Sequence, residues 1–514
     1  MTVPSFVSHG DPLPPVPGGS VDGLLARAAA AHPDRAAVVV PDGGVTTFAE
    51  ADRRASGYAR GLRALLGGER SVVLLSAALI AEFPALYYGI VRAGHVVAPA
   101  NQLYPAELLE YVLTRSRARA AVVTPAVWQK LAPLRDRLPE LEHVLLIGPE
   151  QDGVPSVHTL LDGDHPELPQ ADGGFAEQTA CVLFTSGSTR MPKPVRLSHR
   201  NLLTGAVQLS TAHGQTAESV VLNGLPIYHP MHMNASMRVG ATHVLSGGEA
   251  TDALAAANRY RASHFYTLPF RLIQLANHPR LAELRLDTVK VVSTGGLPLR
   301  PAVLRALAGQ FGVPVLQGYG MCESSSLATS DLPTAPRQGS VGRPLAGSRM
   351  RIVDLETRAP LAAGAVGEIQ LAGPNVMQGY LVEQPEEAVD ADGWLSTGDV
   401  GRLDADGNLF FLDRVRDVFR SGGELVCPGE IEAVLAERPE VAECAVVDAP
   451  DGEETVPVAF VVTRPGAERS TGLITEVNEL LGLHQQLHRA EYLEALPRLP
   501  NSKVDRTALR KRVR

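Results

Sequence analysis

The sequence predicts an α/β fold: a large N-terminal domain of layered, mostly parallel sheets with a small β-barrel-like subdomain, followed by an α+β C-terminal domain. The layered sheets are predicted because apolar, strand-like runs alternate with helical stretches from residue 21 onwards. The barrel-like subdomain is predicted because the pattern changes near Gly339 to short strands separated by Gly and Pro. With 514 residues, the chain is also too long for one small core.

The N-terminal domain begins with a Pro- and Gly-rich lead-in at residues 1–19, which we expect to be irregular. Helices are then expected at residues 24–31, 48–66 and 106–115, and strands at residues 36–40, 72–75, 96–98 and 120–123. In sheets built this way, ligands bind beyond the carboxyl ends of the strands. The loops that follow the strands are therefore the expected place for a site.

The last part of the chain begins near Asp413 and again mixes helices with strands. Helices are expected at residues 428–438 and 476–484, and strands at residues 443–447 and 456–462. A unit of about a hundred residues is large enough to form a core of its own. We therefore expect a separate α+β domain here.

Charge and hydropathy argue against several classes of protein. The formal net charge of −9 argues against nucleic acid as the main partner, because phosphate backbones are bound by clustered Lys and Arg. The first twenty residues contain no Lys or Arg and no apolar segment, so they do not resemble a signal peptide. The most apolar window, residues 72–91, is interrupted by Glu82 and Pro84, so no membrane span is expected.

The four cysteines are Cys181, Cys322, Cys427 and Cys444. They are widely scattered and form no CxxC pair, which supports neither a disulfide framework nor a zinc site. A reducing compartment fits this pattern best. We therefore expect a cytoplasmic protein.

A Ser-, Thr- and Gly-rich loop with one lysine follows an apolar strand; it reads FTSGSTRMPKPVRLSHRN, residues 184–201. Such a loop suits a polyphosphate, because small residues let backbone N–H groups converge on oxygen atoms. An ordinary surface turn has a similar composition, so the loop alone does not decide the function. Three more strand-to-loop junctions carry the small or aromatic residues that a nucleotide pocket needs: residues 226–229, 293–296 and 317–320.

The chain resembles the adenylate-forming superfamily, which holds acyl-CoA synthetases, stand-alone adenylation domains and beetle luciferases. The resemblance extends from residue 21 to residue 511, and its motifs occur in the order of the family: residues 184–195, 226–229, 293–298, 318–323, 396–399, 413–432 and 500–506. It implies a two-step reaction, in which a carboxylate attacks the α-phosphate of ATP to give an acyl-adenylate and a thiol then displaces AMP.

The resemblance also implies that the C-terminal domain rotates between the two steps. The implied limits are an N-terminal domain at residues 1–412, a hinge at residues 413–417 that contains Arg416, and a mobile domain at residues 418–514.

The resemblance assigns roles around the nucleotide. Asp399 is implied to accept both ribose hydroxyls, because a carboxylate has two acceptor oxygens. Tyr319 is implied to stack on adenine, and Glu323 to hold Mg²⁺ on the phosphates if MgATP is used. The implied nucleotide-binding set is Thr185, Ser186, Ser188, Thr189, Gly295, Gly296, Gly318, Tyr319, Gly320, Met321, Cys322, Asp399 and Arg414.

Three residues receive catalytic roles from the resemblance. Lys503 matches a mobile lysine that bridges the carboxylate and the α-phosphate, where a compact ammonium offsets developing charge. Arg414 should reach the ribose or the α-phosphate, and His229 matches a gate beside the carboxylate and the thiol path. The implied CoA-binding residues are Gly422, Gly423 and Glu424, and the implied acyl pocket is formed by His229, Met231, Met233 and Gly320. For the two methionines, a packed core is the alternative.

The phosphate loop departs from the family pattern at two positions. Arg190 stands where the family has Gly or Ser, and its side chain fills volume intended for the β- and γ-phosphates. Pro194 removes a backbone donor and fixes its own φ. A third departure is Cys322, whose thiol replaces a hydroxyl and is a weaker hydrogen-bond donor.

These departures predict an enzyme that makes an acyl-CoA thioester from an acyl-adenylate and CoA, with the ATP-dependent half weak or lost. ATP and Mg²⁺ are then doubtful as cofactors, whereas CoA and AMP, as acyl-adenylate, are expected. The partners would be a hydrophobic carboxylic acid or its adenylate and an upstream adenylating enzyme. The alternatives are a complete ATP-dependent acyl-CoA synthetase, an adenylating enzyme that loads a carrier-protein thiol, and a nucleotide-binding scaffold without catalysis.

Overall fold

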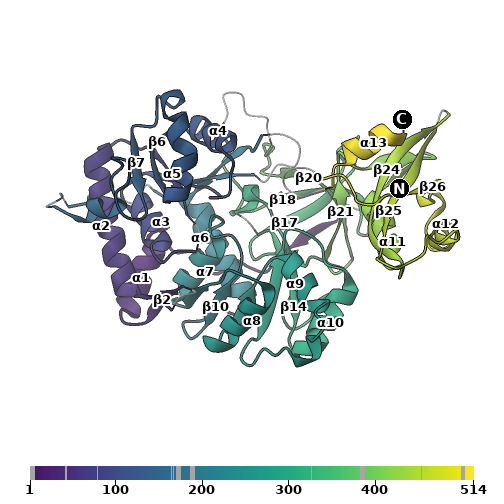
Figure 1. Cartoon of the computed structure of the whole chain (residues 1–514), viewed down its shortest axis with the longest axis horizontal. Helices are drawn as coiled ribbons and strands as arrows, with labels where there is room; N and C mark the ends of the chain where they lie inside the picture. The colour runs from purple at the N-terminus through teal and green to yellow at the C-terminus, as the bar shows by residue number, and fades with distance from the viewer. Residues whose placement is uncertain are drawn as a thin grey trace.

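The structure is a computed structural model of the whole chain (Figure 1). It describes residues 6–40, 43–77, 79–163, 165, 167–168, 175–185, 191–325, 327–381, 388–452, 454–498 and 504–513. The predicted site residues Ser186, Ser188, Thr189 and Lys503, together with Arg190, lie outside the described residues.

The N-terminal domain contains two large, mostly parallel sheets, as the alternation of strands and helices predicts. The first has the strand order β19 (Gly379–Tyr380), β9 (Pro194–Ser198), β8 (Thr179–Phe184), β5 (Val96–Pro99), β4 (Val72–Ser76), β6 (Ala118–Val123) and β7 (His143–Leu146). Strands β4 to β8 are parallel, while β9 and β19 run antiparallel at one edge.

The second large sheet carries most of the strand ends that form the candidate site. Its strand order is β16 (Arg343–Pro344), β15 (Thr329–Ser330), β14 (Val315–Tyr319), β13 (Val291–Gly295), β12 (His264–Tyr266), β10 (Val220–Asn223), β11 (Thr242–Leu245), β2 (Ala36–Val39) and β3 (Val45–Thr47). The strands from β14 to β2 are parallel.

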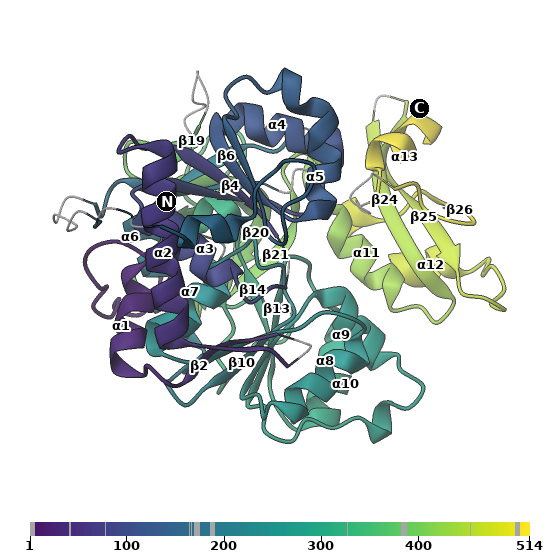
Figure 2. The same ribbon diagram turned by 60° about the vertical axis from the view of Figure 1, so that its left-hand side comes forward.

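Helices surround and separate these sheets (Figure 2). They are α1 (Gly23–Ala31), α2 (Phe48–Leu66), α3 (Phe83–Arg92), α4 (Ala106–Ser116), α5 (Pro125–Leu131), α6 (His199–Ala212), α7 (Met231–Val239), α8 (Ala250–Arg259), α9 (Pro269–Ala276) and α10 (Pro301–Phe311), with the short 3-10 helices η1 (Ala132–Arg137), η2 (Val157–Leu161), η3 (Leu281–Glu283) and η4 (Cys322–Ser324). The predicted helix at residues 48–66 coincides with α2, whose Thr47 side chain caps it by accepting from the Glu50 backbone N–H.

The predicted barrel-like subdomain is an antiparallel sheet with the strand order β1 (Val7–His9), β17 (Arg349–Val353), β18 (Gly367–Ala372), β20 (Leu395–Leu403) and β21 (Leu409–Arg414). Within the described residues β1 and β21 are its edges, so the sheet is open rather than a closed barrel. Strand β1 comes from the lead-in that we expected to be irregular. It forms because residues 7–9 pair with β17, a long-range contact that no local pattern signals.

The C-terminal part folds around a core of its own, beside the end of β20 and β21 (Figure 1). Its strands are β22 (Phe419–Ser421), β23 (Glu424–Val426), β24 (Val441–Asp451), β25 (Glu454–Thr463) and β26 (Arg489–Tyr492), and its helices are α11 (Pro428–Ala436), α12 (Leu473–Asn478), η5 (Leu483–Gln485) and α13 (Arg506–Val513). The predicted helix at residues 476–484 is replaced by α12, which starts earlier, and by the separate turn η5. The domain limits and the hinge at residues 413–417 stay predictions.

Arg506, at the start of α13, makes a bidentate ion pair with Glu432 of α11. The two N···O distances are 2.6 and 3.0 Å, and both side chains are four-fifths buried. We expect Arg506→Met to lower the free energy of unfolding of the C-terminal part by about 3 kcal/mol, because it leaves a buried carboxylate unpaired. Denaturant unfolding measures this. Arg498→Met, which breaks the exposed pair with Glu443, is the control and should cost less than about 1 kcal/mol. Equal losses in the two variants would contradict this expectation.

In the described part of the chain, no helix is long and apolar enough to cross a membrane. The four cysteines are all free thiols.

Candidate nucleotide and acyl site

A cleft lies where the carboxyl ends of β13 and β14 meet the end of β20 and β21. It brings together many of the predicted nucleotide residues from distant parts of the chain. Its lining is Gly296, Leu297, Pro298, Gln317, Gly318, Tyr319, Gly320, Met321, Val341, Asp399, Phe411 and Arg414. The position matches the expectation that ligands bind beyond the carboxyl ends of parallel strands.

Asp399 is the centre of this cleft. Strands β20 and β21 pair so that Asp399 lies directly opposite Arg414, and the Arg414 Nε contacts Asp399 Oδ1 at 2.8 Å. The Tyr319 hydroxyl donates to Asp399 Oδ2 at 2.8 Å. Burial and the Asp399 charge raise the pKa of Tyr319 well above its usual value, so the hydroxyl keeps its proton. A buried carboxylate is thus held with its two oxygens in a defined orientation.

Two residues that the sequence reasoning missed shape the same cleft. Phe411 of β21 lies beside Tyr319, with the ring centroids 6.1 Å apart and the planes at 30°. Glu368, buried on β18, accepts the Gly398 backbone N–H at 3.0 Å and so holds the turn that presents Asp399. Both lie on strands whose alternating pattern reads as ordinary sheet, so the sequence carries no local signal for either.

The backbone conformation or a close neighbour requires glycine at three of the predicted glycine positions. A Cβ on Gly295 would lie 3.0 Å from the Gly318 carbonyl oxygen. A Cβ on Gly318 would lie 2.9 Å from Leu327 and 3.0 Å from the Thr329 carbonyl oxygen. Gly296 has a φ of +96°, which L side chains rarely adopt.

The predicted phosphate loop is described only at its base. There the Thr185 N–H donates to the Lys193 carbonyl at 3.1 Å, and the Lys193 N–H donates to the Thr185 hydroxyl at 3.0 Å. Pro194 is the first residue of β9, and its carbonyl accepts from the Leu381 N–H at 2.8 Å. A proline is tolerated at the first position of a strand, so its ring fits the sheet. Of the two effects predicted for Pro194, only the missing backbone N–H donor remains.

Cys322 lies at the start of η4, under the phosphate loop. Its buried thiol donates to the Phe184 carbonyl across 3.7 Å. Burial, and then the neighbouring Glu323, raise the pKa of the thiol far above its usual value. The side chain is therefore a neutral, weak donor that points at a backbone carbonyl.

Glu323 is connected to the base of the phosphate loop through Tyr380 of β19. The Tyr380 hydroxyl donates to Glu323 Oε1 at 2.8 Å, and the Lys193 ammonium lies 4.8 Å from the centroid of the Tyr380 ring. Burial raises the pKa of Glu323. Among the described residues, no three His, Cys, Asp or Glu side chains gather as a metal site.

His229 precedes α7, and its ring lies 4.8 Å from the ring of Tyr228. Burial lowers the pKa of His229 to about 4, so the imidazole is neutral at physiological pH. Its Nδ1 is buried and has no hydrogen-bond partner among the described residues. The imidazole is thus neutral, and its role as a gate stays a prediction.

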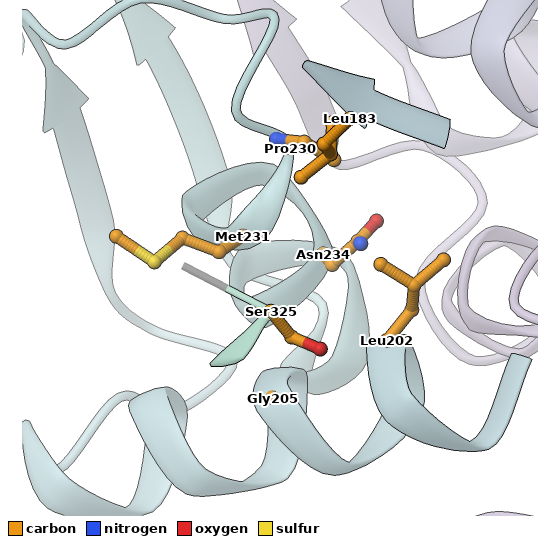
Figure 3. Close-up of a pocket in the computed structure, with 7 residues that line it drawn as sticks. All are labelled: Leu183, Leu202, Gly205, Pro230, Met231, Asn234 and Ser325. Atoms are coloured by element: carbon orange, nitrogen blue, oxygen red, sulfur yellow. The ribbon is translucent and has the colours of Figure 1, made fainter. Parts of the chain in front are cut away.

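Three of the predicted acyl-pocket residues lie in different parts of the structure. Met231 lines a small enclosed pocket between β8, α6 and α7 (Figure 3), formed by Leu183, Leu202, Gly205, Pro230, Met231, Asn234 and Ser325. Gly320 lines the nucleotide cleft instead. Met233 is 1% exposed and packs in the hydrophobic core, which is the alternative that the sequence left open.

The predicted CoA-binding residues form the turn of an exposed hairpin. Gly422 and Gly423, with φ of +57° and +83°, connect β22 to β23, where Glu424 begins. The hairpin contacts the N-terminal domain through Arg420, whose guanidinium lies 2.8 Å from Glu356. The predicted hinge residue Arg416 forms an ion pair with its neighbour Asp417 at 3.6 Å. In the orientation described, the turn is not part of the cleft lining.

Comparison with known families supports the assignment that the motifs predicted. The AMP-binding enzyme family matches residues 25–381, and the AMP-binding enzyme C-terminal domain matches residues 430–503. The chain belongs to the AMP-binding enzyme family. Asp399, Tyr319 and Arg414 line the cleft, and their roles toward a nucleotide stay predictions.

Individual members of the AMP-binding enzymes resemble this chain along almost its whole length. A 4-coumarate–CoA ligase 5 of Oryza sativa subsp. japonica is 30% identical over 500 residues, which cover 93% of this chain and 91% of the relative. The crystal structure of the anthranilate CoA ligase AuaEII with anthranoyl-AMP has a TM-score of 0.85 and 25% identity and covers 98% of both chains. ATP-bound MatB from Rhodopseudomonas palustris also has a TM-score of 0.85, with 27% identity, over 96% of this chain and 99% of MatB.

Proposed function

We propose that this AMP-binding enzyme is an acyl-CoA ligase that forms a thioester from an acyl-adenylate and CoA, and that its ATP-dependent adenylation half is weakened. The observation that carries the proposal is the contrast between the two ends of the nucleotide site. The group of Asp399, Tyr319 and Arg414 is completely assembled for AMP. The groups for the phosphates depart from the family pattern.

The AMP end can hold an adenylate without rearrangement of the backbone. Asp399 is 2% exposed and already oriented by Arg414 and Tyr319, so its oxygens can exchange these contacts for two ribose hydroxyls. The smooth wall of Gly295, Gly296 and Gly318 leaves room for a flat base. Arg414 is half exposed, and in this proposal its guanidinium binds the phosphate of AMP.

The phosphate end lacks donors that adenylation needs. The Cys322 thiol is directed at the Phe184 carbonyl, and a thiol is a weaker donor than the hydroxyl it replaces. Pro194 has no N–H to offer. Arg190 lies outside the described residues, and its proposed effect rests on the volume of its side chain in the loop. Since each ~1.4 kcal/mol is a factor of ten in rate, a loss of a few kcal/mol slows adenylation by roughly 100-fold or more.

In this proposal, residues of both domains take part in the second step, in which the CoA thiol displaces AMP. The neutral His229 stands beside the path of the thiol and carries no charge that would bind the leaving AMP. The exposed turn of Gly422 and Gly423 has no side chains to obstruct a thin pantetheine chain. In this proposal, the C-terminal domain rotates about residues 413–417 and brings that turn to the cleft. Lys503 keeps the role in adenylation that the family resemblance implies.

A complete ATP-dependent acyl-CoA synthetase is the second candidate. It is favoured by the contact of Glu323 with Tyr380 and by the Lys193 ammonium on the same ring, because Lys193 lies at the described base of the phosphate loop. Bound Mg²⁺ would supply charge neutralisation to the phosphates at Glu323. It is also favoured by the names of the relatives, which are CoA ligases, and by the ATP found in MatB.

The remaining assignments complete the proposal. The acid is a carboxylic acid with a largely hydrophobic body, the thiol is CoA rather than a carrier protein, and an upstream enzyme delivers the acyl-adenylate. We place the reaction in the cytoplasm.

The test compares the two halves of the reaction in parallel. One set of assays supplies ATP, Mg²⁺ and a panel of acids with CoA, and the other supplies the preformed acyl-adenylates with CoA. We expect thioester from the adenylates at a rate roughly 100-fold or more above that from ATP and acid. Equal rates would establish the complete synthetase. Thioester on a holo-carrier protein but not on CoA would establish a carrier-loading enzyme, and no thioester at all would leave a nucleotide-binding scaffold.

A further inference from the structure

Asp399 lies in a bulge of strand β20. The neighbouring strand β18 places Glu368 opposite Val400 and Gln370 opposite Ser396, so one residue of β18 faces three residues of β20. The extra residues of a bulge cannot all use the regular ladder of backbone hydrogen bonds, and a bulge re-aims the side chains that it carries. The conformation of this bulge therefore decides where the Asp399 carboxylate points.

The side chain of Glu368 replaces part of the missing ladder. Its Oε1 accepts the Gly398 N–H at 3.0 Å, and Gly398 has a φ of +71°, which a regular strand does not use. The Gly398 carbonyl accepts the Val415 N–H at 2.9 Å. Val415 lies in the proposed hinge and would move with it, whereas Glu368 belongs to the N-terminal domain. Glu368 is thus the contact that keeps the bulge in place if the C-terminal domain rotates.

Arg358 holds the other oxygen of Glu368. The Glu368 side chain is only 7% exposed, and its Oε2 forms an ion pair with the Arg358 guanidinium. The same guanidinium donates to the Ser396 hydroxyl, at the start of the bulge, at 2.8 Å. Arg358 has a φ of +61°, a left-handed conformation that is uncommon for a residue with a side chain. A buried carboxylate and an arginine in a strained conformation are thus kept together at the bulge, although neither residue lines the cleft.

We propose that Glu368 and Arg358 are positioning residues that make the site selective for a ribose with both hydroxyls. The inference rests on the proposed acyl-CoA ligase function, in which Asp399 accepts the two hydroxyls. A charged acceptor binds the Gly398 N–H more strongly than a neutral one, and the fixed peptide sets the direction of the next side chain, Asp399. Arg358 keeps the buried Glu368 carboxylate paired and in place. Without the two residues, the base and the phosphate of AMP would keep their contacts, but the Asp399 carboxylate would lose its alignment with the ribose.

The test compares AMP with dideoxy-AMP, the analogue that keeps the base and the phosphate but lacks both ribose hydroxyls. Calorimetric titration of the whole chain gives the ratio of the two dissociation constants. We expect the wild type to bind AMP about 100-fold more tightly, because each hydroxyl that donates to a carboxylate contributes about tenfold or more. In Glu368→Ala this preference should fall by about tenfold or more, while the affinity for dideoxy-AMP changes by no more than about twofold. Glu368→Gln, which keeps an acceptor for the Gly398 N–H, should retain most of the preference.

Glu432→Ala is the matched control, because Glu432 is also a buried carboxylate paired with an arginine, but it lies in the C-terminal part. It should lower stability and leave the ratio unchanged. Arg358→Leu changes a half-exposed side chain and should fold even if Glu368→Ala does not, and its preference should fall by about threefold or more. The inference is overturned if Arg358→Leu keeps the wild-type ratio, if Glu432→Ala lowers the ratio equally, or if Glu368→Gln loses as much of the preference as Glu368→Ala.

The two proposals fail in different ways. Absence of thioester with every acyl-adenylate would contradict the ligase function, and the ratio of the two nucleotide affinities would still report on Glu368 and Arg358. Equal affinities of the wild type for AMP and dideoxy-AMP would overturn the inference even if thioester forms.

Discussion

Replacing Asp399 with Asn is expected to lower kcat/KM for thioester formation from an acyl-adenylate and CoA by about 100-fold or more. The carboxylate accepts two ribose hydroxyls in the proposed complex, and a hydrogen bond to a charged group contributes about 1.5 to 3 kcal/mol. An amide presents only one acceptor oxygen and directs its NH₂ group at a donor. The change also removes the ion pair with Arg414 and weakens the hold on Tyr319.

Steady-state kinetics and calorimetric titration with AMP measure this effect. Asp406→Asn is the control, because Asp406 is an exposed carboxylate in the turn between β20 and β21, only a few residues from Asp399. Asp406→Asn should change neither kcat/KM nor the affinity for AMP by more than about twofold. If Asp399→Asn binds AMP as tightly as the wild type while its Tm is unchanged, the assignment of the ribose site is wrong.

The double reversion Arg190→Gly with Pro194→Gly is expected to raise the rate of ATP-dependent adenylation by about tenfold or more. In this proposal, the first change removes the bulk of the arginine side chain from the loop, and the second returns one backbone N–H to the phosphates. Stabilising the transition state of adenylation by about 1.4 kcal/mol raises the rate about tenfold. Pyrophosphate release from ATP and acid measures adenylation. The rate from preformed acyl-adenylate should stay the same, because neither residue contacts the AMP end of the cleft in this proposal.

Met191→Gly is the control for added loop flexibility. Met191 adjoins Arg190 and is 50% exposed, so its loss neither frees the phosphate volume nor adds a donor. It should leave adenylation unchanged. Cys322→Thr is a second, independent variant that restores a hydroxyl under the loop, and it should add to the gain. If pyrophosphate release is the same in the double reversion and the wild type, the loop is not the cause of slow adenylation.

Much of the nucleotide site could be read from short motifs. Tyr319 and Asp399 are flanked by glycines and small residues in an order that few other functions require, and the structure places them 2.8 Å apart through the tyrosine hydroxyl. The role of that hydroxyl was not predicted. The motif indicates that an aromatic ring is present, but its partner is 80 residues away along the chain and is set by the meeting of two sheets.

The places of Met233 and of residues 7–9 differ from what was expected for the same reason: both depend on contacts that are distant in the sequence. Met231 and Met233 are two residues apart, and the sequence does not say which of them faces a cavity. Packing of α7 against α1, α6 and β11 decides it, and Met233 is buried in the core. Likewise, residues 7–9 become β1 only because β17 offers an unpaired edge.

By itself, the sequence determined the alternation of helices and strands and the family, because local periodicity and contiguous motifs encode them. It also predicted the residues proposed to bind AMP. Only the tertiary structure decided that Phe411 lines the cleft, that Glu368 holds the turn that presents Asp399, and that Cys322 turns to the Phe184 carbonyl. It also decided that His232 is buried without a hydrogen-bond partner among the described residues. Those properties depend on contacts between segments that are far apart in the chain, and their free energies come from burial and hydrogen bonding that no local pattern encodes.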